Sequence, residues 1–259
     1  MSSLNTPSLS FEDMLSLIED RSAALRTGAA AAGPDARVPG CPDWSVRDLV
    51  AHLGEVHLFW SAAVTAGPAD SPPEDSAVGD TEPHGELLTW SADSTAALAR
   101  ALRAAGPDRS CWTWWQSSGA PMTAGAVARH QVQEAGVHAL DAQQAAKTAE
   151  PLPPAVAADG VGEFLSVGLR SSGPWPHDQA TVVLAAGEGG NWLVDLGPDG
   201  AQVSELAEAA VSQVAADATV TARPDDLVLA FYRRQGPDPL LVTGDRGIVT
   251  RLLDWPDMD

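Results

Sequence analysis

The chain has 259 residues, 44% of them hydrophobic, which is enough for one large domain or two smaller domains with a proper core. Its formal net charge of −20 argues against nucleic acid or an anionic membrane as a partner. No stretch approaches the roughly 18 consecutive apolar residues of a membrane span, and the N-terminus lacks a signal-peptide pattern. We therefore expect a cytoplasmic monomer or homodimer that binds small molecules.

Cysteine usage is sparse. Only Cys41 and Cys111 are present, which argues against a disulfide scaffold in a chain of this length. Neither cysteine belongs to a CxxC motif, so a cysteine-ligated zinc site is not expected. A catalytic cysteine stays open as a weaker alternative.

Four helices are predicted in the first 150 residues. Residues 10–13 have a capping-box pattern, which Ser45 and Asp48 repeat at the second helix after a loop at residues 38–43. The third and fourth helices are expected at residues 84–105 and 123–146. The inner stripe of the second helix is predicted to hold Leu49, His52, Leu53, Val56 and Trp60. Helices of this length predict an up-and-down bundle, whose interior commonly holds metal sites.

The second part of the chain has a different pattern. A proline-rich linker at residues 151–154 is followed by four predicted strands and two predicted helices. The strands are expected at residues 181–184, 191–194, 218–222 and 240–244, and the helices at 225–232 and 248–253. The fold class is therefore α+β, with a metal-binding four-helix bundle at residues 1–150 and a smaller α+β domain at residues 159–259.

Three side chains on two predicted helices suit a catalytic metal. Glu134 and His138 are four residues apart and share one helix face. His52 from the second helix would complete a set of two histidines and one carboxylate, which is a catalytic zinc arrangement with one position left open.

The fourth helix carries more ionisable groups than this pair. His130, Glu134, His138 and Asp141 fall within a stripe of roughly 80°, and burying all four would be costly without an ion or partners. A solvated face is the alternative, although the flanking residues are Ala, Val and Leu rather than Lys and Glu. His130 competes with the other two as a ligand. Asp141 either accepts a hydrogen bond from a ligand histidine or faces the substrate, whereas His57, about 140° from His52, is not expected to bind metal.

These motifs resemble the mycothiol-dependent maleylpyruvate isomerase family. The similarity covers most of the chain and is carried by residues 38–53, 112–114, 123–124, 134–142, 159–165 and 240–246. The resemblance implies a DinB-like metal-binding four-helix bundle followed by a sterol-carrier-like C-terminal domain. It also implies His52, Glu134 and His138 as zinc ligands, although another divalent metal stays possible, and mycothiol as the cosubstrate.

The chain departs from its relatives around these ligands. Gln133 stands where relatives often have His, and Ala139 where they often have Arg. Arg129 and His130 stand where two adjacent arginines are common. The ligand set is intact while its surroundings differ, which puts maleylpyruvate in doubt as the substrate.

A zinc-bound thiol would exist as the thiolate, which is the nucleophile. Release of the adduct or displacement product gives thiol S-transfer, which tolerates altered surroundings and is the preferred interpretation. Breakdown after rotation about a former double bond gives cis–trans isomerisation. A non-catalytic protein that binds a metal or a small ligand is the third possibility.

Several further residues are candidates for the site. The tryptophans before the fourth helix either cover one end of the bundle or line a ligand pocket, so Trp112 and Trp114, with Arg129, are predicted to bind the thiol cosubstrate. Asp141 and Arg246 are the candidate catalytic residues, since an arginine would hold a carboxylate substrate. A surface salt bridge is the alternative for both arginines.

Overall fold

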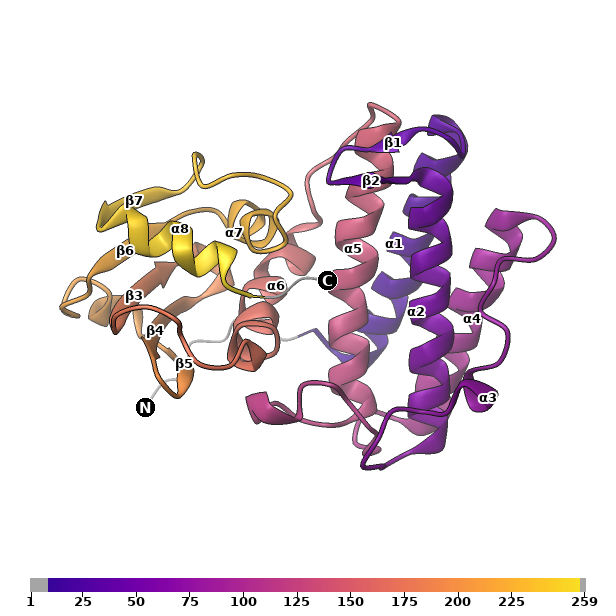
Figure 1. The fold of residues 1–259 in the computed structure, drawn as a ribbon, viewed down its shortest axis with the longest axis horizontal. Helices are drawn as coiled ribbons and strands as arrows, with labels where there is room; N and C mark the ends of the chain where they lie inside the picture. Colours follow the sequence, from indigo (N-terminus) through magenta and orange to yellow (C-terminus); the bar gives the residue numbers. More distant parts are fainter. Residues whose placement is uncertain (1–8, 257–259) are drawn as a thin grey trace. The chain divides into compact units, whose positions relative to one another are not determined.

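The computed structural model describes residues 9–256, which divide into two compact units. The helical unit consists of Leu9–Trp114 and Pro121–Leu152. The second unit consists of Trp115–Ala120 and the chain from Pro153 onward (Figure 1). Helices and a largely antiparallel sheet occur in one chain, so the predicted α+β class is confirmed.

The helical unit is built from four long helices and one short one (Figure 1). Helix α1 packs mainly against α5, and α2 packs mainly against α4. Gly54 permits the second contact, because a Cβ atom there would overlap the ring of Trp90. The helices are α1 (Phe11–Ala32), α2 (Val46–Ala66), α3 (Asp75–Val78), α4 (Leu87–Ala105) and α5 (Ala124–Ala145).

A capping box fixes the start of α2. The Asp48 carboxylate accepts a hydrogen bond from the backbone N–H of Ser45 at 2.8 Å, and the Ser45 hydroxyl oxygen accepts one from the backbone N–H of Asp48 at 3.3 Å. The same device starts α1 at Ser10. Since the cap sets where α2 begins, it also sets the level at which His52 lies, two turns into the helix.

A small hairpin precedes α2 where the sequence predicted a loop. Strands β1 (Arg37–Val38) and β2 (Cys41–Ser45) pair antiparallel with an irregular register. Val38 is fully buried in the bundle core. The prolines at positions 39 and 42 suggested a loop, but apolar burial of Val38 holds the segment in a paired form, so the predicted loop was wrong.

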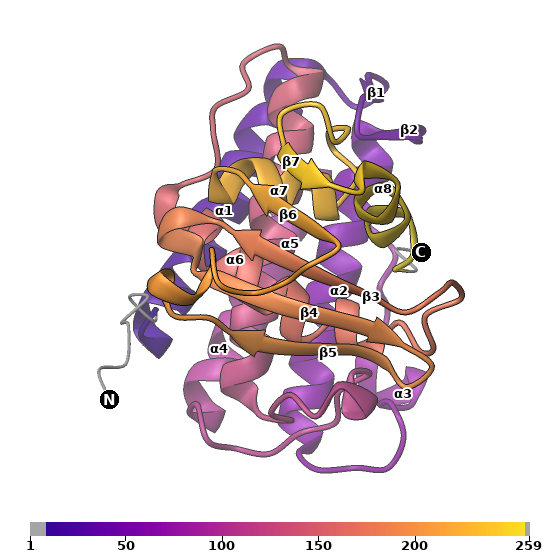
Figure 2. The same ribbon diagram turned by 90° about the vertical axis from the view of Figure 1, so that its left-hand side faces the viewer.

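The second unit is organised around a five-stranded sheet with the order β5-β4-β3-β6-β7 (Figure 2). The β3–β6 pair is parallel and the other pairs are antiparallel. The strands predicted at residues 181–184 and 191–194 are confirmed as β3 and β4, which pair with each other. The strands are β3 (Ala180–Ala185), β4 (Asn191–Gly197), β5 (Gly200–Glu205), β6 (Ala218–Thr221) and β7 (Leu241–Gly244).

Three helices complete the second unit: α6 (Pro154–Ser166), α7 (Pro224–Phe231) and α8 (Arg246–Asp254). Phe164 of α6 stacks on Phe231 of α7 with ring centroids 4.5 Å apart. The sequence did not predict α6, whose first turn contains a proline that is tolerated there. No helix crosses residues 146–153, since α5 ends at Ala145. Within residues 9–256 no helix is long and apolar enough to span a membrane.

Candidate metal centre

An apolar cluster holds α2 and α5 together around the predicted ligands. Leu49 and Leu53 of α2 and Ala139 and Ala142 of α5 are buried in the same cluster. His52 lies between the two leucines in sequence, and His138 directly precedes Ala139. Close packing restrains the backbones that carry these side chains, so the two histidines project from rigid elements.

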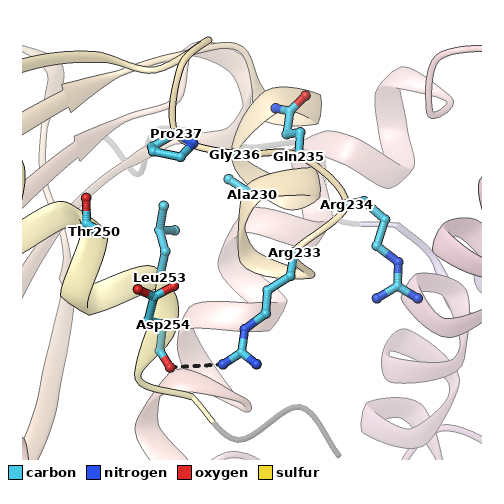
Figure 3. Close-up of a pocket in the computed structure, with 9 residues that line it drawn as sticks. All are labelled: Ala230, Arg233, Arg234, Gln235, Gly236, Pro237, Thr250, Leu253 and Asp254. Carbon is cyan, nitrogen blue, oxygen red and sulfur yellow. Dashed lines mark hydrogen bonds between the residues drawn. The ribbon is translucent and has the colours of Figure 1, made fainter. Parts of the chain in front are cut away.

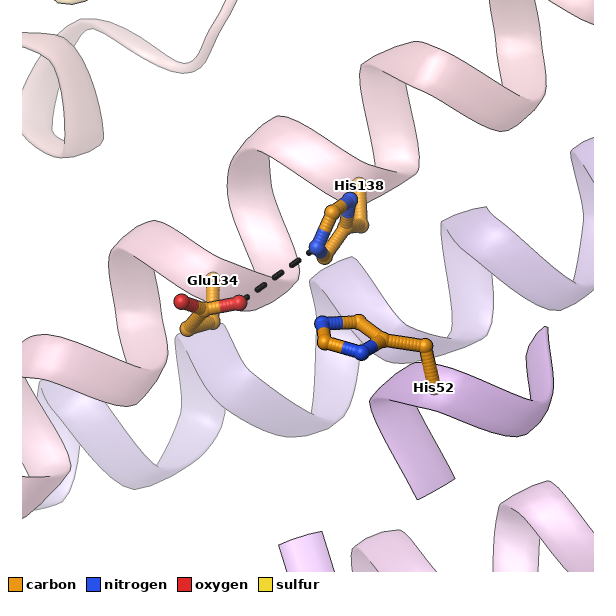
Figure 4. Close-up of side chains that lie close together, drawn as sticks. All are labelled: His52, Glu134 and His138. Carbon is orange, nitrogen blue, oxygen red and sulfur yellow. Dashed lines mark ion pairs between the residues drawn. The ribbon is translucent and has the colours of Figure 1, made fainter. Parts of the chain in front are cut away.

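The structure brings together His52, Glu134 and His138. One potential ligand atom from each lies within 4.8 Å of the others. Figure 4 shows the two imidazoles and the carboxylate converging, with Glu134 Oε2 and His138 Nε2 3.4 Å apart. His138 is buried, whereas His52 and Glu134 are partly exposed. His52 and Glu134 therefore keep some contact with solvent.

Asp141 lies behind His138. Its Oδ2 atom is 3.0 Å from His138 Nδ1, and its side chain is fully buried. A hydrogen bond from this nitrogen to a carboxylate leaves Nε2 as the lone-pair donor that faces Glu134. The geometry favours the first of the two roles that the sequence left open for Asp141, the acceptor for a ligand histidine.

The charges of the cluster reinforce one another. Burial alone would raise the pKa of Glu134, but its hydrogen bond with His138 and the nearby histidines hold that pKa well below its usual range. Burial alone would lower the pKa of His138, but hydrogen bonds with Asp141 and Glu134 raise it to about 9. A cation is therefore favoured at this position: a proton on His138, or a metal ion that replaces it.

The donor set fits a resident metal ion. Two imidazole nitrogens and one carboxylate oxygen match a zinc site with an open position, and the Asp141 carboxylate supplies the usual support for a ligand histidine. Imidazole donors also suit iron and nickel, so the geometry leaves several divalent metals possible.

Trp44 is a site residue that the sequence analysis did not single out. Its ring centroid is 4.7 Å from that of His52 and 6.1 Å from that of His138. It lies on β2, just before the cap of α2. Its place in the motif next to Ser45 was visible, but its contact with both histidines depends on the β1–β2 hairpin, which the sequence did not predict.

His130 continues the stripe of α5 on the other side of Glu134. Its Nε2 atom is 3.8 Å from Glu134 Oε1, farther than that of His138. His130 does not belong to the three-residue group that converges within 4.8 Å. Its ring instead contacts Trp60 and Trp114, with centroids 6.2 and 5.7 Å away.

His57, not Val56, belongs to the buried stripe of α2. The structure buries His57 completely and leaves His52 and Val56 partly exposed, so that part of the predicted inner stripe was wrong. Burial lowers the pKa of His57 to about 3. Neither of its ring nitrogens has a hydrogen-bond partner among the described residues, so it is a neutral imidazole in the bundle interior.

The other candidates are spread over the chain. Trp112 and Trp114 precede α5, and Arg129 lies on α5 next to His130. Trp115 is fully buried, which makes it unsuitable for the pocket lining considered for these tryptophans. Arg246 starts α8 in the second unit, where its guanidinium pairs with Asp238 at 3.4 Å. That pair is the salt bridge considered as its alternative role.

The second unit has a pocket of its own between α7 and α8, with a volume of about 310 Å³ (Figure 3). Arg233 and Arg234 extend on one side of it, and Thr250, Leu253 and Asp254 lie on the other. The Arg233 guanidinium donates hydrogen bonds to the carbonyls of Asp254 and Pro256 at 2.9 and 2.7 Å. These hydrogen bonds therefore stabilise the C-terminal end of α8.

Fold and site together define a bundle protein with a two-histidine, one-carboxylate centre. Residues 15–143 match the family described as the mycothiol maleylpyruvate isomerase N-terminal domain. Through this domain the chain belongs to the mycothiol-dependent maleylpyruvate isomerase family, a family of enzymes, and the predicted resemblance is confirmed.

Solved structures share the fold. The chain is similar to the crystal structure of a mycothiol-dependent maleylpyruvate isomerase and to that of a point mutant of the same enzyme. In both comparisons the identity is 14%, the TM-score is 0.59, and the match covers 94% of this chain and 96% of the other. No curated protein matches the chain significantly in sequence.

Proposed function

We propose that the protein is a zinc-dependent enzyme that uses mycothiol to attack a small electrophile, with His52, Glu134 and His138 as the metal ligands. The convergence of these three side chains within 4.8 Å carries the proposal. The family match supports the same chemistry, because its description names a mycothiol-dependent isomerase domain.

Isomerisation of a maleylpyruvate-type substrate is the first candidate reaction, since the matched family and the similar solved structures carry that name. The preferred sequence interpretation, thiol S-transfer, becomes the second candidate. It is favoured by Gln133 and Ala139, both buried where relatives often have His and Arg. Both reactions begin with attack by the same sulfur and differ in whether the adduct breaks down after rotation or is released.

The roles of the chain's own residues follow from their positions. A bound zinc ion would supply Lewis acidity that favours the thiolate form of the cosubstrate. Asp141 fixes the orientation of His138 through the 3.0 Å hydrogen bond. Trp44 packs on His52 and His138 and covers one flank of the centre. The thiol is therefore expected to approach from the partly exposed side of Glu134.

Further side chains are proposed to contact the thiol and the electrophile. Trp112 and Arg129 are proposed to contact the bound thiol, and Arg246 is proposed to hold a carboxylate of the electrophile. Arg246 already has Asp238 as an ion-pair partner and is half exposed. A carboxylate substrate would have to compete with Asp238 for the Arg246 guanidinium.

The proposal is tested with zinc-loaded protein, mycothiol and two kinds of substrate. Loss of maleylpyruvate absorbance would report isomerisation, and mass spectrometry of products from an electrophile panel would report S-transfer. We expect one of these activities to require both zinc and mycothiol and to vanish in His138→Ala. Turnover of neither substrate class, or equal turnover by the zinc-free variant, would contradict the proposed function.

A further inference from the structure

A cluster of aromatic rings adjoins the candidate metal centre in the helical unit. Phe59 and Trp60 come from α2, and Trp112 comes from the segment before α5. Trp60 and Trp112 are stacked with centroids 6.2 Å apart, and Phe59 meets them edge to face at 5.3 and 5.8 Å. Trp60 is only 3% exposed. These three rings form a packed wall.

Trp114 differs from the rings of this wall in its exposure to solvent. Its side chain is 45% exposed, and only it and Leu241 are exposed large hydrophobic side chains among the described residues. If a tryptophan only covered the end of the bundle, its ring would be buried, as that of Trp60 is. The indole of Trp114 is nearly half exposed, so it still has apolar ring surface that a partner could bury.

His130 joins Trp114 to the metal centre. Its ring meets that of Trp114 at 73° with centroids 5.7 Å apart, and it meets Trp60 in a similar manner. Its Nε2 atom is 3.8 Å from Glu134 Oε1. His130 lies next to both Trp114 and Glu134, so the indole is one imidazole away from this carboxylate, a separation that a small substrate can span.

We propose that the exposed face of Trp114 is the subsite for the electrophile, and that the preferred electrophile has its reactive carbon in a flat aromatic ring or next to one. This inference rests on the proposed function, because it names the substrate of the same thiol. Stacked or edge-to-face aromatic pairs add to the free energy of burial, and saturated groups lack this contribution. The exposed indole thus favours electrophiles with flat rings, and the packed wall and His130 restrain the indole itself.

Two electrophiles of different shape test the subsite. In 1-chloro-2,4-dinitrobenzene the thiolate sulfur forms a bond to the ring carbon while chloride leaves with its electron pair; in iodoacetamide the same displacement occurs at a saturated carbon. We expect Trp114→Ala to lower kcat/KM about tenfold for the aromatic electrophile and less than twofold for iodoacetamide. Trp114→Phe should restore most of the aromatic preference. Leu241→Ala, which removes the other exposed apolar side chain, is the matched control and should change neither value.

Binding is measured separately from turnover. Metal-depleted protein is titrated calorimetrically with 2,4-dinitroaniline, a flat analogue without a good leaving group, and Trp114→Ala should weaken binding about tenfold. Trp114-dependent binding without any turnover would support the subsite while refuting the proposed function. Equal loss of both electrophiles in Trp114→Ala, or analogue binding that is unaffected by this variant, would overturn the subsite.

Discussion

His138 Nδ1 and Asp141 Oδ2 are 3.0 Å apart, and this hydrogen bond occurs behind a histidine that faces the candidate metal centre. Both residues lie on α5, three positions apart, so the contact is built into one helix and does not depend on the packing of another. The carboxylate is fully buried. Asp141 therefore sets both the orientation and the tautomer of His138 from within the same rigid element.

Asp141→Asn should weaken zinc binding by roughly tenfold to a hundredfold, because the amide removes the charge that supports His138 while keeping the shape. Zinc affinity is measured by competition with a chromophoric chelator. Asp93→Asn, at an exposed aspartate of α4, is the matched control and should bind zinc like the wild type. Unchanged affinity in Asp141→Asn would remove Asp141 from the support of the ligand.

The three proposed ligands should differ from His130 in a direct metal assay. His52→Ala and His138→Ala are expected to lose stoichiometric zinc and activity together, since each removes one of three converging donors. His130→Ala should retain zinc, because its Nε2 atom lies outside the group. Zinc content is read by elemental analysis of purified protein. Stoichiometric zinc in either of the first two variants would refute this ligand set.

His57 should make the metal-free protein less stable in acid. Its pKa is about 3 in the folded state because burial opposes its charge, whereas an unfolded histidine has a pKa of about 6.5. Only the unfolded chain takes up this proton as the pH falls from 6.5 toward 3. The contribution of His57 to stability is complete above pH 6.5 and declines by about 1.4 kcal/mol per pH unit below it.

His57→Gln should remove that component, so the free energy of unfolding of the variant should fall less steeply between pH 6.5 and 4.5, by about 2 kcal/mol over the interval. The measurement is urea denaturation of metal-depleted protein at several pH values. His84→Gln, at an exposed histidine, is the control and should follow the wild type. Parallel curves for wild type and His57→Gln would show that His57 is not buried as a neutral imidazole.

The two predicted domains should separate at the segment between α5 and α6. Helix α5 ends at Ala145 and α6 begins at Pro154, so residues 146–153 contain no helix to protect them. Limited proteolysis is expected to cut within this segment and to release fragments that begin or end there, as determined by mass spectrometry. If the protease cut first within α6 and left residues 146–153 intact, the predicted boundary would be contradicted.

The sequence was sufficient for the parts of the structure that local patterns determine. Ser45 with Asp48 marks the start of α2, and the four-residue spacing of Glu134 and His138 places both on one face of α5. Both patterns depend on neighbours within one or two helical turns. The convergence of His52 on that pair is a tertiary feature, and its expectation depended on the family resemblance as well as on spacing.

The features that the sequence did not predict depend on contacts between distant segments. Val38 is held in a β1–β2 hairpin by burial in the bundle core, despite the nearby prolines. Strand β5 looks polar in sequence because Gln202, Ser204 and Glu205 are exposed, yet it pairs along β4. His57 is buried although its position suggested the outer side of α2, because helix phase within the bundle is set by packing.

The proposed activation of a thiol is tested most directly by zinc K-edge X-ray absorption of the zinc-loaded protein before and after addition of mycothiol. Three protein ligands without sulfur should give nitrogen and oxygen scatterers only, at about 2.0–2.2 Å. With mycothiol present, we predict one new sulfur scatterer at about 2.3 Å in the wild type. A spectrum of the wild type that does not change when mycothiol is added would contradict the account.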